Sequence, residues 1–214
     1  YLLISHDHWD HLDYATATAL RSKVGQVVCP LGVGAHFEAW GYGKETVFEG
    51  DWYSVLEGKG GFAIHILPAR HFSGRSLTRN KTLWAGFALV TPERRIFFSG
   101  DSGYGKHFAE IGARFGGFDL AMLDCGQYDE NWRYVHMMPE DTAQAAEDLR
   151  ARALLPGHVG KFAIAYHTWD DPFKRIVAAS RGKPYRLLLP LIGEPVVLPI
   201  ASDGESLRWW EAGR

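Results

Sequence analysis

Three histidines and two aspartates lie within six consecutive residues near the start of the chain. The stretch reads His6-Asp7-His8-Trp9-Asp10-His11. Because side chains two residues apart in an extended segment point the same way, His6 and His8 can bind one metal ion. Asp10 and His11 would face a second ion as the chain turns. Imidazoles and carboxylates are ligands that suit zinc and similar divalent ions. The alternative is a solvated loop in which an aspartate caps the following helix.

Three more candidate ligands each follow a segment with the pattern of a buried strand. They are His71 after residues 62–67, Asp101 after residues 95–99 and His158 after residues 153–155. Because the edge of a sheet delivers several loops to one rim, such residues can converge although they are distant in sequence. Taken singly, each has an ordinary interpretation, since a histidine after a strand can lie at the surface and Gly-Asp-Ser-Gly is typical of a turn. Together with the first motif they favour a metal site.

The elements that must position these residues are short apolar strands separated by helices and glycine-rich turns. Strands are expected at residues 1–4, 26–29, 62–67, 83–91, 95–99, 120–123, 153–155, 185–191 and 195–200. Helices are expected at residues 14–24, 31–40, 106–115, 139–152 and 171–180. Strands interleaved with helices predict an α/β layered domain.

Composition narrows the class of protein. The 214 residues include 46% hydrophobic residues, which predicts a single folded domain over residues 1–214. A formal net charge of −2 argues against a protein that binds nucleic acid by neutralising phosphates. No apolar run reaches the roughly 20 residues that span a bilayer. Two cysteines are too few for a disulfide scaffold. A cytoplasmic location is therefore expected, with peripheral contact to a membrane left open.

The candidate ligands, in this order along the chain, resemble those of the metallo-β-lactamase-fold hydrolases that hold two metal ions. Within that superfamily, Ser-His-Asp-His-Trp-Asp-His-Leu-Asp-Tyr at residues 5–14 is similar to the motif of the N-acylphosphatidylethanolamine-hydrolysing phospholipase D group and its bacterial relatives. Phe-Ser-Gly-Asp-Ser-Gly-Tyr at residues 98–104 and Glu-Ile-Gly-Ala-Arg-Phe-Gly at residues 110–116 resemble that group as well. The resemblance extends from Leu3 to about Tyr166 and weakens afterwards.

The resemblance implies an αββα sandwich with two metal ions at one rim of its sheets. It implies that one ion is held by His6, His8, His71 and Asp101, and the other by Asp10, His11, Asp101 and His158. The ions are expected to be zinc, with manganese or iron as alternatives. Members of the fold carry several strands before the first motif, whereas only residues 1–4 precede it here. We therefore expect the natural polypeptide to have an N-terminal segment that completes the first sheet.

The mechanism expected of such a site uses water rather than a side chain as the nucleophile. Two neighbouring ions lower the pKa of a shared water, so the attacking group would be metal-bound hydroxide, which Asp10 would orient or deprotonate. His136 resembles a family position near the substrate, where it would bind phosphate or assist the leaving group; it can also be a histidine without a chemical role. Tyr128 and Trp132, in an aromatic-rich loop, are candidate substrate-binding residues unless they only pack.

These inferences favour a metal-dependent phosphodiesterase that acts on a small-molecule or phospholipid-like substrate. A lactonase or amide hydrolase, similar to the ascorbate-6-phosphate lactonase group, is the alternative, because attack on a carbonyl needs the same metals. A non-catalytic metal-binding domain is the third interpretation. The retention of all seven candidate ligands argues against it.

Overall fold

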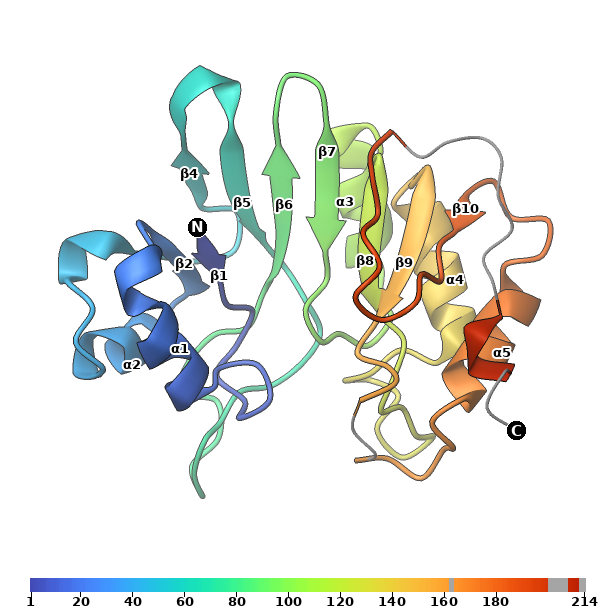
Figure 1. The fold of residues 1–214 in the computed structure, drawn as a ribbon, viewed down its shortest axis with the longest axis horizontal. Helices are drawn as coiled ribbons and strands as arrows, with labels where there is room; N and C mark the ends of the chain where they lie inside the picture. The colour runs from blue at the N-terminus through green and yellow to red at the C-terminus, as the bar shows by residue number, and fades with distance from the viewer. Residues whose placement is uncertain (162–163, 200–207, 212–214) are drawn as a thin grey trace.

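Two β-sheets lie face to face in the computed structural model, which describes residues 1–161, 164–199 and 208–211 (Figure 1). The first sheet is parallel and contains β1 (Leu2–Leu3), β2 (Val27–Pro30) and β3 (Val47–Gly50) in that order. The second sheet has the order β10-β9-β8-β7-β6-β5-β4. Its strands are β4 (Val55–Glu57), β5 (Ala63–Leu67), β6 (Gly86–Val90), β7 (Arg95–Phe98), β8 (Leu120–Asp124), β9 (Ala153–Gly157) and β10 (Arg186–Leu187).

Helices cover the outer face of each sheet. The helices α1 (Tyr14–Leu20) and α2 (Gly34–Ala39) pack on the first sheet, and α3 (His107–Phe115), α4 (Pro139–Asp148) and α5 (Asp171–Ala179) pack on the second (Figure 1). Alternation along the strands produces these layers, because successive side chains point to opposite faces. In β8, Ala121 and Leu123 pack toward the helices, whereas Leu120 and Met122 face the other way. The expected αββα sandwich is confirmed.

The core between the two sheets joins apolar side chains from both. Val28 of the first sheet packs with Ile64, Ile66 and Phe87 of the second, and all four are fully buried. Burial of an aliphatic or aromatic side chain of this size stabilises a fold by about 1.5–3 kcal/mol. This contact holds the two sheets in a constant relative position, so loops from both can build one site.

Before residue 185 the expected elements are confirmed with shifted ends, and two strands were missed. The helix expected at residues 14–24 becomes α1 followed by a 3-10 turn at Arg21–Lys23. Its first turn is capped by Asp13, whose carboxylate accepts a hydrogen bond from the Thr16 backbone at 2.7 Å. The short strands β3 and β4 were not expected. They contain only four and three residues, too few to show a clear alternation.

The strands expected near the C-terminus are wrong in extent. The segment 185–191 contains only the two-residue strand β10, and residues 195–199 form no strand; Ile200 lies outside the described residues. The apolar side chains Leu188, Val196 and Leu198 pack instead against the inner face of β7, β8 and β9. The Leu188 backbone amide still donates to the Leu154 carbonyl at 2.8 Å, so pairing at the sheet edge ends there, and Val196 and Leu198 contribute packing on the sheet face.

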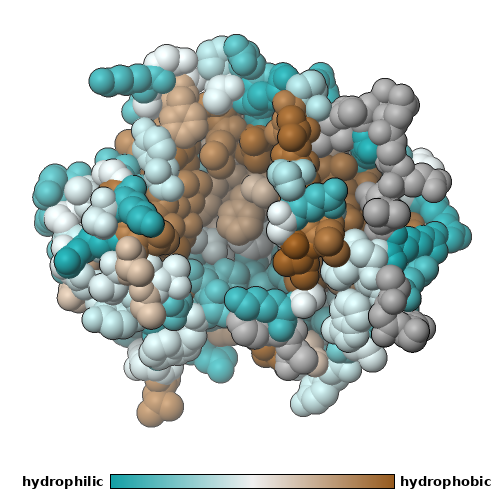
Figure 2. Space-filling model, viewed as in Figure 1, coloured by the Kyte–Doolittle hydropathy of each residue, from teal (hydrophilic) through white to brown (hydrophobic). Residues whose placement is uncertain are grey.

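Apolar side chains gather in the middle of the face shown in Figure 2, around a hollow between the first sheet and the segment after β10. A cavity of about 310 Å³ on the inner face of the second sheet is lined by Phe98, Met122, Leu155 and the segment 188–194. Among the described residues, no helix has both the length and the apolar character needed to cross a membrane.

Candidate metal centre

The candidate ligands meet because four strands of the second sheet run in the same direction. The strand β5 is antiparallel to β6, which is antiparallel to β7, and β7, β8 and β9 are parallel. The carboxyl ends of β5, β7, β8 and β9 therefore share one edge, the lower one in Figure 1. The loops after β5, β7 and β9 carry His71, Asp101 and His158, and Asp124 ends β8.

The first motif reaches the same edge from the other sheet. It follows β1 and makes a tight turn, in which the backbone amides of His11 and Leu12 donate to the His8 carbonyl at 3.1 and 2.8 Å. The guanidinium of Arg75 donates to the carbonyls of Asp7 and Leu12 at 2.9 and 2.5 Å and thus holds the motif at both ends. Nothing in the sequence pattern singled out Arg75, because its partners are backbone atoms of a distant segment.

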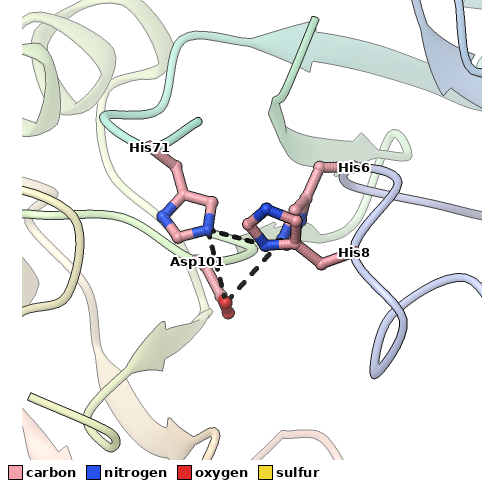
Figure 3. A group of neighbouring side chains, drawn as sticks. All are labelled: His6, His8, His71 and Asp101. Atoms are coloured by element: carbon pink, nitrogen blue, oxygen red, sulfur yellow. Dashed lines mark hydrogen bonds and ion pairs between the residues drawn. The ribbon is translucent and has the colours of Figure 1, made fainter. Parts of the chain in front are cut away.

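The three-imidazole cluster consists of His6, His8 and His71 (Figure 3). Nδ1 of His8 lies 2.9 Å from Nε2 of His6 and 3.2 Å from Nε2 of His71. Burial and the neighbouring imidazoles lower the pKa of His6 well below its ordinary value, and burial lowers the pKa of His71 to about 4. The ring of His71 is oriented by the Val135 carbonyl, 2.9 Å from Nδ1. These rings are neutral at pH 7, the form in which an imidazole binds a metal.

The carboxylate-rich cluster consists of Asp10, His11 and His158. Nε2 of His158 lies 3.3 Å from the Asp10 carboxylate, and Nε2 of His11 lies 3.5 Å from it. Burial disfavours charge on His11, but the nearby carboxylates of Asp10 and Asp101 raise its pKa to about 9. Burial opposes charge on His158 as well, and Asp10 and Asp124 raise its pKa to about 11. The nearby imidazoles of His11 and His158 lower the pKa of Asp10.

One oxygen of Asp101 lies between the two clusters. Its distances to the Nε2 atoms of four histidines are 3.1 Å (His11), 3.6 Å (His158), 3.7 Å (His71) and 3.8 Å (His6). The structure thus brings all seven sequence-predicted ligands together at one rim. A carboxylate in this position can bind two neighbouring cations at once.

The chemistry of these donors fits divalent metal ions. Every ligand atom in the two clusters is an imidazole nitrogen or a carboxylate oxygen, the set that suits zinc. Nε2 of His11 is buried and has no hydrogen-bond partner among the residues that the structure describes, although it lies 3.1 Å from Asp101. A buried nitrogen that faces carboxylates without hydrogen-bond geometry is suited to a cation.

A cavity of about 490 Å³ opens directly above the candidate ligands. His8, Asp10, His71, Asp101 and His158 form its polar base. Its walls are largely apolar, with Phe72, Trp132, Val135 and Ile164, and Arg79 and Gln127 add polar groups. Of these wall residues, sequence analysis proposed only Trp132. The others follow from tertiary contacts and carry no signal of their own in the sequence.

The other candidate substrate-contacting residues occupy different positions. His136 lines the cavity, and its Nδ1 lies 2.9 Å from the Asp124 carboxylate. Tyr128 does not line the cavity. Its ring is buried and stacks on His167, and its hydroxyl donates to Asp171 at 2.5 Å. The packing alternative considered for this aromatic loop therefore describes Tyr128, while substrate binding by Trp132 stays a prediction.

Comparisons with known proteins place this site in a family. The model of the beta-lactamase superfamily domain matches residues 1–159, which include all seven candidate ligands. The chain belongs to this superfamily. An archaeal relative by structure, the metallo hydrolase Igni18 from Ignicoccus hospitalis, has a TM-score of 0.66 at 17% identity, over 87% of this chain and 74% of that one. Metal-dependent hydrolases with the metallo-β-lactamase fold thus share the architecture described above.

Relatives by sequence include proteins of bacteria and eukaryotes. An uncharacterized protein of Mycobacterium tuberculosis is 42% identical over 199 residues, which cover 91% of this chain and 53% of the relative. The mitochondrial N-acyl-phosphatidylethanolamine-hydrolyzing phospholipase D of Saccharomyces cerevisiae is 35% identical over 205 residues, 90% of this chain and 43% of the relative. This chain therefore spans about half the length of these curated relatives.

Proposed function

We propose that the protein is a phosphodiesterase that uses two divalent metal ions, with His6, His8, His71 and Asp101 holding one and Asp10, His11, Asp101 and His158 the other. The observation that carries this proposal is the position of Asp101, whose one oxygen faces imidazoles of both clusters beneath a single cavity. Two cations that share a carboxylate suit a reaction in which an attacking and a leaving oxygen are both stabilised.

The substrate class we propose is a phospholipid-like diester. A polar base beneath apolar walls matches a molecule with a charged phosphate and apolar chains. The guanidinium of Arg79, over the ring of Phe72 with 5.2 Å to the centroid, adds a positive charge beside the cavity. The names of relatives support the same class, since the yeast protein is a phospholipase D that hydrolyses N-acyl-phosphatidylethanolamine. A phosphodiester bound here would place its anionic group toward the histidines.

Bound metal ions would supply an activated water and offset the negative charge that develops on phosphate. Asp10 stands between His11 and His158 with its carboxylate ionised, so it can accept a hydrogen bond from the water and orient it. His136, across the cavity base, is placed to donate a hydrogen bond to a phosphate oxygen or to the leaving group. Phe72, Trp132 and Val135 would exclude bulk water from the reacting group.

Hydrolysis of bis(p-nitrophenyl) phosphate compared with a simple lactone tests the proposed reaction. We expect cleavage of the diester by zinc- or manganese-loaded protein, loss of that activity with a chelator, and its return when the metal is restored. Vesicles that contain N-acyl-phosphatidylethanolamine test the proposed substrate class, with phosphatidic acid as the product to be measured. Vesicles of phosphatidylcholine alone are the matched control.

The lactonase or amide hydrolase alternative gives a different result in the same assay. Activity on lactones with none on any phosphodiester would assign the protein to that class. If metal-loaded protein cleaved neither kind of substrate, the phosphodiesterase proposal would be wrong.

A further inference from the structure

Asp124 is a buried carboxylate beside the candidate metal centre that the proposed ligand sets do not use. It is the last residue of β8, its side chain is completely buried, and it does not line the 490 Å³ cavity. Asp10 and Asp101, by contrast, both face that cavity. A fully buried carboxylate is costly unless its oxygens are occupied, so its partners indicate its role.

Each oxygen of Asp124 faces one histidine and one backbone amide. Oδ2 lies 2.9 Å from Nδ1 of His136 and accepts from the amide of Ser102 at 3.2 Å. Oδ1 lies 3.5 Å from Nδ1 of His158, a contact without hydrogen-bond geometry, and accepts from the amide of Gly126 at 3.3 Å. Each oxygen therefore already accepts a hydrogen bond from a backbone amide.

The backbone around Asp124 holds the carboxylate in place. Its amide donates to the Ser99 hydroxyl at 2.9 Å, and its carbonyl accepts from the Thr142 hydroxyl at 2.7 Å. Gly126 allows the His158 backbone to approach, since a Cβ at Gly126 would lie 1.8 Å from the His158 carbonyl oxygen. His158 itself has a φ of 61°, a conformation that costs energy for a residue other than glycine.

The direction of these contacts determines which nitrogen of each ring is free to bind a metal or a substrate. An imidazole whose Nδ1–H faces a carboxylate keeps the Nε2 lone pair for a metal or a substrate. Nε2 of His158 indeed faces Asp10 and Asp101, at 3.3 and 3.6 Å. His136 lines the cavity, and its ring stacks on that of His158 with 5.3 Å between centroids and 14° between planes.

We propose that Asp124 is a positioning residue that orients His158 toward the carboxylate-rich cluster and His136 toward the substrate, one through each of its oxygens. A single carboxylate would thus couple the binding of one metal ion to the placement of a substrate-contacting imidazole. This inference rests on the proposed function for the roles of the two histidines, but not for the contacts themselves.

Binding of Zn²⁺ to Asp124→Asn tests the proposal without substrate. A carboxamide has one acceptor oxygen and one donor group, so it can accept from only one Nδ1–H. We expect competition with a chromophoric chelator to show one of the two ions bound about 10- to 100-fold more weakly, with the other unchanged, because loss of an outer partner of a metal ligand has effects of this size. Equal affinity of both ions in variant and unaltered protein would overturn the proposal.

Asp119→Asn is the matched control, because Asp119 precedes the same strand at its opposite end and accepts from the Arg95 amide at 2.9 Å. We expect it to leave both zinc affinities unchanged. Asp124→Asn could instead weaken the binding of both ions equally and lower the melting temperature of the metal-free protein far more than Asp119→Asn does. Asp124 would then act only by stabilising the fold, and the proposal would be wrong.

The orientation of His136 has its own readout. At saturating Zn²⁺ we expect Asp124→Asn to lower kcat on bis(p-nitrophenyl) phosphate and leave KM nearly unchanged, and to cause little further loss in a His136→Ala background. Fully additive losses in the double variant would contradict coupling through His136.

A measurement on the unaltered protein covers the case in which Asp124→Asn does not fold. Long-range ¹H–¹⁵N spectra of the zinc-loaded protein should show Nδ1 protonated in both His136 and His158. An unprotonated Nδ1 in either ring would overturn the proposal. The spectra and the zinc titrations involve no substrate, so a protein that binds Zn²⁺ as expected but cleaves no phosphodiester would refute only the proposed reaction.

Discussion

The two clusters of the candidate site use the same kinds of side chain in opposite electrostatic settings. In the three-imidazole cluster, buried rings face one another, and burial lowers the pKa of His71 to about 4. In the carboxylate-rich cluster, Asp10 and Asp124 raise the pKa of His158 to about 11 against the effect of burial. The first cluster therefore presents neutral ligands at pH 7, whereas in the metal-free protein the histidines of the second are held as cations beside carboxylates.

This difference shows that the neighbouring groups, and not the residue type, decide the protonation state of a histidine. Desolvation lowers the pKa of the rings in both clusters, although the carboxylate-rich cluster is the more exposed of the two. Carboxylate oxygens raise the pKa of His11 and His158, whereas neighbouring imidazoles add to the effect of burial on His6. Variants of three residues at the site test this difference between the clusters. A variant of His107, away from the site, measures how acid affects the stability of the fold.

Asp101→Ala should have the largest effect, because Asp101 is the one carboxylate shared by both clusters. We expect weaker binding of both metal ions and a fall in kcat/KM of about 10³-fold or more, since the loss of an ion removes several kcal/mol of charge stabilisation. Zinc stoichiometry by elemental analysis and phosphodiester hydrolysis measure the two effects. Loss of only one ion would show that Asp101 does not bridge the clusters.

Asp10→Asn should alter the carboxylate-rich cluster and leave the three-imidazole cluster intact. Asp10 contacts His11 and His158 and is not part of the three-imidazole cluster. We expect kcat to fall by about 10²- to 10³-fold, because the water loses the group that orients it, while the three-imidazole cluster still binds its ion. Full phosphodiesterase activity in this variant would rule out the proposed role of Asp10.

His136→Ala should have a milder effect than either change. His136 lines the cavity and is not one of the seven proposed ligands, so its loss removes one hydrogen-bonding group near the substrate. We expect kcat to fall about 10- to 100-fold, with zinc stoichiometry unchanged. A change in stoichiometry would mean that His136 belongs with the ligands.

The smallest expected effect concerns acid stability of the fold, which must be known before the pH profiles of the two clusters are compared. Burial lowers the pKa of His107 from 6.5 to about 4. Between these values the unfolded chain binds a proton that the folded protein does not bind, so stability falls as the pH falls from about 6.5 to about 4. The contribution of His107 is fully present above pH 6.5, and its loss approaches about 3 kcal/mol by pH 4.

Urea unfolding of His107→Gln at pH 7 and pH 4.5 measures this contribution. We expect the free energy of unfolding to fall less with acid in the variant than in the unaltered protein. Lys106→Gln, whose side chain is 91% exposed, is the control and should behave like the unaltered protein. An unchanged pH dependence in His107→Gln would show that His107 does not sense acid in the folded state.

Local patterns in the sequence were sufficient for most of the fold because strand alternation and helix-forming segments are local properties. The strands around Ile64, Phe97 and Leu154 follow from their apolar runs, and their order implies layers. The three-residue strand β4 and the early end of the C-terminal strand were not predictable in this way. Pairing of so few residues depends on what lies beside them, which local sequence does not record.

For the site, the sequence by itself determined the candidate donors, since seven histidines and aspartates occur in a recognisable order and three follow strand ends. The tertiary structure alone decided their surroundings. It placed Arg75 behind the first motif, turned Tyr128 into the core and brought Asp124 between His136 and His158. Ligand identity is a matter of side-chain chemistry, whereas burial, protonation and orientation arise from contacts between residues far apart in the chain.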